Sequence, residues 1–265
     1  MATAVRARTE PRGTERKDRW WLEPLSIVLA LGLFGVYTFI VSTVNRAYFA
    51  DPYLSPMYSP CLSSTCPPGE RLFPFTIDLW SLSPAYLIVG LPLAFRLTCY
   101  YYRRSVYRAF FSSPAACAVP DLRRRYAGET RFPFIVQNLH RYALYAAIVI
   151  VAILWIDAIK AFSFPAGADH HVRRFGIGLG TVVLVGNALL LSFYTLGCHA
   201  LRHLVGGSLD SFHGASLRFR LWASVTRLNL HHARWAWISM CSVGLADGYV
   251  RLVASGIIND PRILF

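Results

Sequence analysis

Five runs of apolar residues divide the sequence, and each is long enough to cross a membrane as a helix. The runs cover residues 23–45, 80–102, 139–161, 175–200 and 230–256. A transmembrane helix needs about 20 apolar residues to span a hydrocarbon core of about 30 Å. Prolines and glycines mark the segments between the runs as loops. The pattern therefore predicts an all-α integral membrane bundle of five transmembrane helices.

The same pattern divides the chain into three parts. Residues 1–21 are a basic tail, residues 22–257 form the five-helix transmembrane domain, and residues 258–265 are a C-terminal tail. One outer loop and two inner loops are expected within the domain, at 46–79, 103–138 and 201–229.

Lys and Arg residues are concentrated in alternate segments. Six precede Trp20, seven lie within 103–131, and four lie within 202–227, whereas the segments on the other side carry five in total. Basic residues are enriched in cytoplasmic loops. We therefore expect a cytoplasmic N-terminus, cytoplasmic basic loops and an outer C-terminal tail.

Composition agrees with a membrane protein. The sequence is 55% hydrophobic and 15% charged, with a net charge of +13, whereas soluble domains carry about 25% charged residues. The arginines form short clusters between apolar runs, so membrane topology accounts for them better than nucleic-acid binding. No nucleotide-binding or hydrolase motif is present.

Two cysteines lie in the predicted outer loop, in the sequence PCLSSTCPP. A disulfide between Cys61 and Cys66 is expected there, because extracytoplasmic compartments are oxidising. Two free thiols are the alternative.

Most other cysteines and histidines map to the cytoplasmic ends of the predicted helices. Thiolates and imidazoles at one depth are the ligands of a redox metal centre. A single Cys or His at such a position is more often a packing residue, but eight together favour a redox centre or a quinone site. They are Cys99, Cys117, Cys198, His140, His199, His203, His231 and His232.

Several separate motifs resemble the membrane-anchor subunit of succinate dehydrogenases of the first mycobacterial type. They are LTCYYYRRSVYRAFFSSPAACAV, YAGETRFPFIVQNLHRY, LGCHALRHLVGG, LNLHHARWAW and ADGYVRL, and the similarity covers roughly residues 85–255. The resemblance implies a multi-pass subunit of the bacterial inner membrane, with a flavoprotein and an iron–sulfur subunit as partners. It also implies a Rieske-type 2Fe-2S cluster in the membrane region, and reduction of a quinone, menaquinone, nearby. The complex could form a higher oligomer.

A Rieske-type cluster takes two thiolates and two imidazoles, and the sequence offers more candidates than four. The candidate ligands are Cys99, Cys117, Cys198, His199 and His232. His203 and His232 are alternative donors to a quinone carbonyl, and the set stays open at this point.

The quinone needs hydrogen-bond donors and an aromatic wall. The expected quinone-binding residues are His203, Arg202, Tyr101 and Trp235. Two other hypotheses compete with this one: an anchor with bis-histidine haem b, and a non-redox membrane protein.

Overall fold

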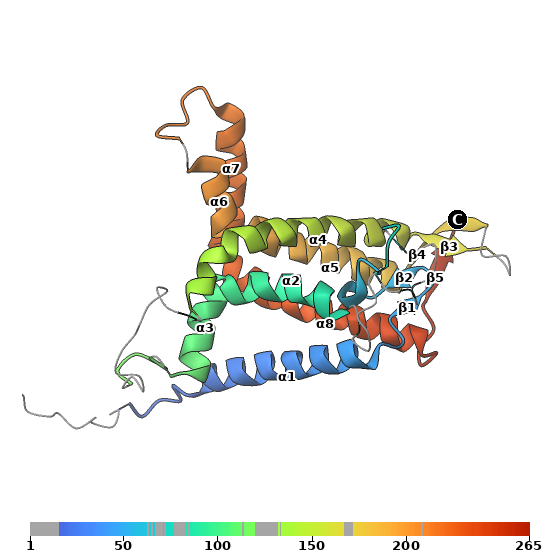
Figure 1. Ribbon diagram of the computed structural model, residues 1–265, viewed down its shortest axis with the longest axis horizontal. Helices are drawn as coiled ribbons and strands as arrows, with labels where there is room; N and C mark the ends of the chain where they lie inside the picture. Colours follow the sequence, from blue (N-terminus) through green and yellow to red (C-terminus); the bar gives the residue numbers. More distant parts are fainter. Residues whose placement is uncertain are drawn as a thin grey trace, which may run out of the picture.

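Long helices run side by side and form the body of the protein (Figure 1). The computed structural model describes residues 16–62, 64, 66, 71, 73–76, 83, 85–112, 114–119, 132, 134–166, 172–207 and 209–265. The long helices are α1 (Leu22–Val44), α2 (Ala85–Thr98), α4 (His140–Lys160), α5 (Leu179–Leu196) and α8 (His232–Ala254). Parts of the predicted N-terminal tail and of both larger predicted loops lie outside the described residues.

Among the described residues, three helices are apolar and long enough to cross a membrane by length and composition: Leu22–Val44, Ile135–Lys160 and Leu179–Leu196. The other two long helices depart from that pattern. The α2 helix has 14 residues and contains Pro92, and α8 carries Asp247 and Arg251 among its apolar residues. The helical membrane fold is confirmed, and the count of five spans stays a prediction.

Short elements cap the two ends of the bundle. At one end, here called the sheet end, lie β1 (Phe49–Ala50), β2 (Tyr53–Leu54), η1 (Pro56–Tyr58), β3 (Ser163–Pro165), β4 (Arg173–Gly178) and β5 (Arg262–Leu264). At the other end, here called the junction end, lie α3 (Tyr100–Phe110), η4 (Phe134–Leu139), α6 (His199–Gly206) and α7 (Ser216–Leu230).

The strands were not predicted from the sequence. The β1 and β2 strands form a hairpin, and β4 lies between β3 and β5 in an antiparallel sheet. Residues 175–178, expected to begin the fourth apolar span, belong to β4 instead, and helix α5 begins at Leu179. The strand lets the segment pair with the C-terminal residues, which closes the sheet end of the bundle.

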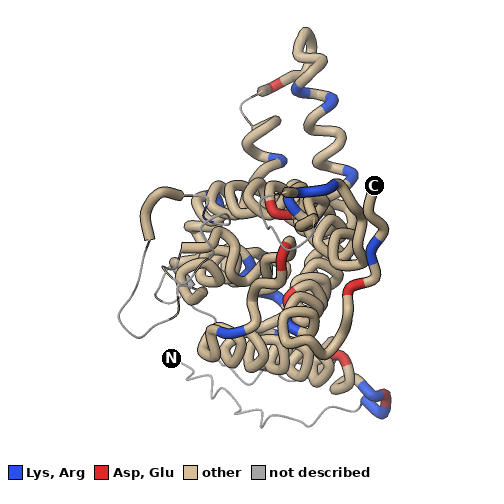
Figure 2. Tube along the Cα trace, turned by 90° about the vertical axis from the view of Figure 1, so that its right-hand side faces the viewer, with Lys and Arg blue, Asp and Glu red and all other residues tan. Residues whose placement is uncertain are grey.

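The α6 and α7 helices project sideways from the junction end as a hairpin (Figure 1). Arg218 donates to the carbonyl oxygen of Val205 from Nε and Nη2, at 3.0 and 2.8 Å, which ties the two helices together. Looking along the bundle from the sheet end, Figure 2 shows basic residues on this hairpin. The predicted inner loop 201–229 is therefore largely helical.

A buried ion pair within α8 makes further hydrogen bonds to α1 and to the loop after it. Asp247 is fully buried and accepts from Arg251 Nε at 2.8 Å and from Tyr37 Oη at 2.5 Å. Ser55 also donates to Asp247, and Arg251 Nη1 donates to the carbonyl oxygen of Arg46 at 2.6 Å. The charges that make α8 costly in lipid are thus paired within the protein.

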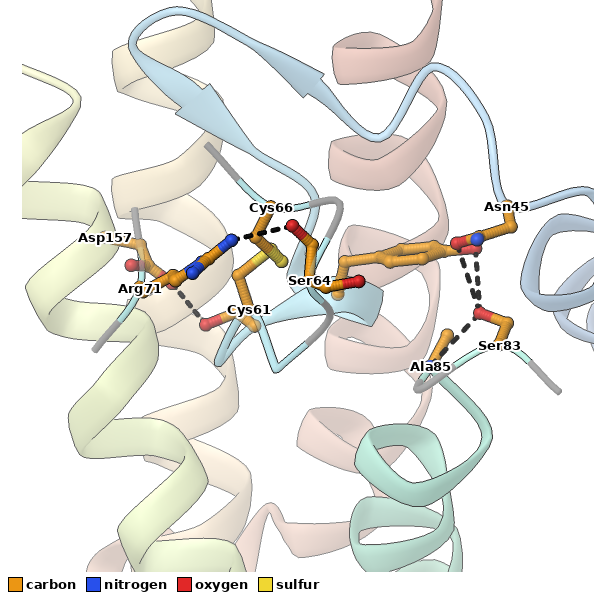
Figure 3. Close-up of a disulfide and its surroundings, with 10 residues drawn as sticks. Asn45, Cys61, Ser64, Cys66, Arg71, Ser83, Ala85 and Asp157 are labelled. Carbon is orange, nitrogen blue, oxygen red and sulfur yellow. Dashed lines mark hydrogen bonds between the residues drawn. A yellow bond between two sulfur atoms is a disulfide. The ribbon is translucent and has the colours of Figure 1, made fainter. Parts of the chain in front are cut away.

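A disulfide lies in the same region, between Cys61 and Cys66 (Figure 3). Both cysteines are buried. Ser59, two residues before Cys61, donates to Asp157 on α4. Polar contacts to α4 and α8 therefore hold the loop that follows α1 against the bundle, and the disulfide closes a short turn within that loop.

Candidate functional site

Cys99 and Cys198 each lie at a break between two helices of the junction end. Cys99 separates α2 from α3, with φ −65° and ψ 129°, and Cys198 separates α5 from α6, with φ −67° and ψ 139°. Extended backbone at these points turns the chain out of the bundle. The predicted spans 80–102 and 175–200 were too long at this end because each contains such a break. Both thiols are buried, with residue exposures of 3% and 1%.

His140 and His232 begin the other two helices that reach this level, α4 and α8. His140 Nε2 lies 3.0 Å from Cys198 Sγ, and His232 Nε2 lies 3.5 Å from Cys99 Sγ. Four different helix junctions therefore supply two sulfur atoms and two ring nitrogens, which form two thiol–imidazole pairs.

Stacked rings hold the two histidines in place. Phe95 stacks on His140 with ring centroids 4.9 Å apart, and Tyr194 stacks on His232 at the same separation. Phe95 and Tyr194 also contact one another, with centroids 5.3 Å apart. The two thiol–imidazole pairs are therefore neighbours across one aromatic layer, and Cys99 and Cys198 belong to the same buried cluster.

Hydrogen bonds fix the tautomer of His140. The hydroxyl of Thr98 donates to the carbonyl oxygen of Ala94 at 2.7 Å, which is the ordinary bond of a helical threonine. Thr98 Oγ1 is then free to accept the Nδ1 proton of His140, 2.8 Å away. The proton on Nδ1 leaves Nε2 unprotonated, with its lone pair directed to the Cys198 sulfur. A metal-binding histidine is commonly oriented in this way.

His232 has a buried ring nitrogen that makes no hydrogen bond within the described residues. Its Nδ1 has no hydrogen-bond partner among the described atoms, although an unpaired buried polar atom costs about 1–3 kcal/mol. The imidazole is therefore held by ring stacking and by its contact with Cys99.

Arg96 places a positive charge beside the four side chains. Its guanidinium lies 4.7 Å from the ring centroid of Tyr194. It donates to Tyr102 Oη at 2.6 Å, to the Ala236 carbonyl oxygen at 3.0 Å and to Ser239 Oγ at 3.0 Å. These bonds satisfy the partly buried cation and join α2 to α8 at this level. Sequence analysis missed Arg96, which lies within an apolar run.

Two of the sequence-predicted ligands lie apart from the two pairs. Cys117 is an exposed free cysteine, and its carbonyl oxygen accepts from Arg16 Nη1 at 2.7 Å. His199 turns its Nε2 to His203 Nε2, 3.0 Å away, as expected for residues four apart on one helix face. The structure instead pairs Cys198 with His140 and Cys99 with His232. Within the described residues, no three His, Cys, Asp or Glu side chains meet in the arrangement of a complete metal site.

The residues predicted to bind quinone include two buried donors without partners. Trp235 Nε1 and Arg202 Nε have no hydrogen-bond partner in the described part of the chain. The guanidinium of Arg202 lies 4.9 Å from the ring centroid of Trp222. Tyr101 Oη accepts from Trp237 Nε1 at 2.7 Å. These donors lie at the junction end, but no contact joins all of them.

Comparison with known proteins places the chain among membrane subunits. The model of the family described as actinobacterial succinate dehydrogenase subunit SdhC matches residues 22–256. The solved structure of the Mycobacterium smegmatis Sdh1 complex in the apo form contains a chain with 45% sequence identity and a TM-score of 0.87. The match covers 97% of this chain and 96% of that one. No curated protein matches significantly. The protein therefore belongs to the SdhC family of actinobacterial succinate dehydrogenase membrane subunits.

Proposed function

We propose that this membrane subunit passes electrons to a quinone through a Rieske-type 2Fe-2S cluster held by Cys99, His140, Cys198 and His232. The subunit acts in a succinate dehydrogenase complex of the bacterial inner membrane, with a flavoprotein subunit and an iron–sulfur subunit as partners. Succinate oxidation takes place in the partner and releases two electrons. Reduction of one quinone to a quinol consumes two electrons and two protons.

The four side chains fit such a cluster in number, chemistry and environment. Two thiols and two imidazoles are the donor set of a Rieske-type centre, which would supply a one-electron carrier of raised reduction potential. All four reach the same buried layer from different helix junctions. The tautomer of His140 also leaves the ring nitrogen nearest to sulfur ready to bind a metal. The decisive observation is that both imidazoles face a thiol.

Haem b is the alternative centre. Bis-histidine ligation would use His140 and His232 and would leave Cys99 and Cys198 without a role. The positions of the two thiols, 3.5 and 3.0 Å from the histidine nitrogens, therefore favour the cluster. An absorption spectrum of the reduced complex separates the two hypotheses, because haem b gives a sharp α-band.

Quinone reduction at the junction end is supported by the unpaired donors of Arg202 and Trp235. A quinone carbonyl is an acceptor that could satisfy either donor. Tyr101 would supply part of the aromatic wall, and His203 an exposed hydrogen-bonding group. We assign menaquinone as the quinone on the family resemblance.

The proposed topology has five membrane spans, with the N-terminus and the junction end in the cytoplasm. The basic segments favour this orientation. The disulfide between Cys61 and Cys66 belongs to the opposite end of the bundle, where an extracytoplasmic compartment would keep it oxidised.

Iron analysis and paramagnetic resonance of the purified complex test the proposed centre. Cys198→Ser should remove about two iron atoms per complex and one paramagnetic signal, because a Rieske-type cluster holds two irons. Cys241→Ser is the matched control, since Cys241 is an exposed free cysteine of α8. Equal iron content and equal spectra in both variants would contradict the ligand assignment.

A further inference from the structure

An open groove lies at the sheet end, where α4 passes into β3 (Figure 1). Its volume is about 530 Å³. The lining residues come from the end of α4, from the turn after it, and from the paired strands β3 and β4: Ile159, Phe162, Ser163, Arg173, Arg174 and Phe175. The two thiol–imidazole pairs lie at the opposite end of the bundle, so the proposed electron transfer gives this groove no role.

The groove carries a positive charge that the protein does not neutralise. Arg173 is paired, since its Nη1 and Nη2 donate to the two carboxylate oxygens of Asp51 at 3.0 and 2.9 Å. Arg174 is exposed and makes no hydrogen bond or ion pair within the described residues. No acidic side chain is among the described residues that line the groove. The guanidinium of Arg174 therefore favours an anionic ligand, and a phosphate group matches its planar fork of donors.

Aromatic rings make the groove and the sheet beside it apolar. Phe162 and Phe175 stack with ring centroids 5.6 Å apart, and Phe265 lies next to Phe175 with centroids 5.9 Å apart. Phe175 and Phe265 are nevertheless 56% and 71% exposed. Neighbouring exposed rings of this kind mark a surface that contacts a membrane, a ligand or another protein. The ligand of the groove should therefore be apolar on one side and anionic on the other.

An exposed apolar stripe on α4, here called the α4 stripe, leads to the groove. Its members are between 40% and 65% exposed, and their spacing places them on one helix face: Tyr145, Val149, Ile156 and Ile159. The helix Ile135–Lys160 is apolar and long enough to cross a membrane, so this face meets lipid chains. Ile159, the last member of the stripe, also lines the groove. A lipid whose chains follow the stripe would bring its phosphate to Arg174.

We infer that the groove binds an anionic phospholipid from the leaflet at the sheet end, with its phosphate on Arg174 and its acyl chains along the α4 stripe. Such a lipid fits because it joins an anionic headgroup to long apolar chains, and basic pockets beside membrane helices bind such headgroups. A second copy of this chain fits less well. In a twofold pair the same surface meets itself, so two Arg174 guanidinium groups would face each other and repel.

Crosslinking in the purified complex is the first test. A phosphatidylglycerol with a photoreactive diazirine on one acyl chain is added at a limiting concentration, and the labelled peptides are identified by mass spectrometry. Label should appear on the segment that ends α4, and Arg174→Gln should lower its yield about tenfold, because the variant loses the charge that holds the phosphate. Arg262→Gln is the matched control, since Arg262 is exposed on β5 of the same sheet and does not line the groove. Equal yields in the two variants would overturn the inference.

Competition between two lipids is the second test, and the wild-type complex alone decides it if Arg174→Gln fails to assemble. Unlabelled phosphatidylglycerol should displace the photoreactive lipid at about one tenth of the concentration that phosphatidylcholine with the same chains requires, because phosphatidylcholine carries no net charge. In Arg174→Gln the two lipids should compete equally. Equal competition in the wild-type complex would mean that the acyl chains alone are bound, which contradicts a headgroup site.

Assembly and activity separate a lipid site from a contact between chains. Arg174 has no partner within the described residues, so Arg174→Gln should keep the native mass of the complex and its kcat/KM for quinone reduction. Added phosphatidylglycerol should raise the thermal midpoint of the wild-type complex more than that of Arg174→Gln, since a ligand stabilises the folded state that binds it. A variant that dissociates into smaller assemblies while its lipid labelling is unchanged would assign the groove to a neighbouring copy of the chain and refute the lipid site.

Discussion

His140 Nε2 faces the sulfur of Cys198 at 3.0 Å across 58 residues of sequence. The histidine begins one long helix and the cysteine follows the end of another. His232 and Cys99 repeat the arrangement at the next pair of helix junctions. The main prediction of the structure is therefore that His140 is a ligand and that His199 is not.

Replacement of these two histidines tests that choice. His140→Gln should abolish the signal of the membrane cluster, because glutamine cannot replace the ring nitrogen in the ligand set. His199→Gln should preserve it, since His199 contacts His203 and not a thiol. The check is low-temperature paramagnetic resonance of the reduced complex. Loss of the signal in His199→Gln alone would reverse the assignment.

Thr98 should affect the centre through His140. Thr98→Val removes the acceptor for the Nδ1 proton, and loss of such an outer hydrogen bond weakens metal binding or activity about 10–100-fold. The reduction potential of the cluster should shift as well, because the ring is no longer oriented by its partner. Thr226→Val is the control, since Thr226 bonds to the Trp222 carbonyl oxygen in the same way but on α7. A potential equal to that of the control would exclude an orienting role.

The buried ion pair of α8 should matter for stability. Asp247→Leu leaves Arg251 without its carboxylate and should cost about 3–5 kcal/mol of unfolding free energy, as for other broken buried pairs. The loss should appear as a lower thermal midpoint of the complex in detergent. Asp210→Asn, at an exposed position, should change the midpoint little. In the double variant Asp247→Leu with Arg251→Met, most of the loss should be recovered.

The orientation can be tested with single cysteines at the two ends of the chain. In intact cells, a membrane-impermeant maleimide should label Phe265→Cys but not Lys17→Cys, both of which are exposed positions. After the cells are opened, both should be labelled. The reverse pattern would place the junction end outside and would contradict the positive-inside argument.

Much of the bundle could be predicted because hydrophobic run length is a strong signal in membrane proteins. The helices at Leu22–Val44, Ile135–Lys160 and Leu179–Leu196 fall where apolar runs were found. The positions at which the helices end could be predicted less well. Hydropathy continues past Thr98 and Leu196. The backbone nevertheless becomes extended at Cys99, directly after Thr98, and at Cys198, two residues after Leu196. Such a break leaves no mark in a count of apolar residues.

The candidate site was predicted as a layer of Cys and His, and the choice within it was not. His140 was one of eight groups at that level but was not chosen as a ligand. The candidate ligands named from the sequence included His199 in its place. The break between α5 and α6 turns Cys198 and His199 apart, whereas tertiary packing brings His140 to the sulfur. Which side chains meet depends on how helices pack, and spacing within one helix cannot show that.

Nitrogen couplings in the reduced complex test the central claim most directly. Pulsed paramagnetic resonance on protein labelled with ¹⁵N-histidine should detect two coordinating imidazole nitrogens on a membrane cluster, and the His140→Gln and His232→Gln variants should each lose the Rieske-type signal. A membrane subunit that shows no histidine nitrogen coupled to iron–sulfur spin, or that shows bis-histidine haem, would contradict the account.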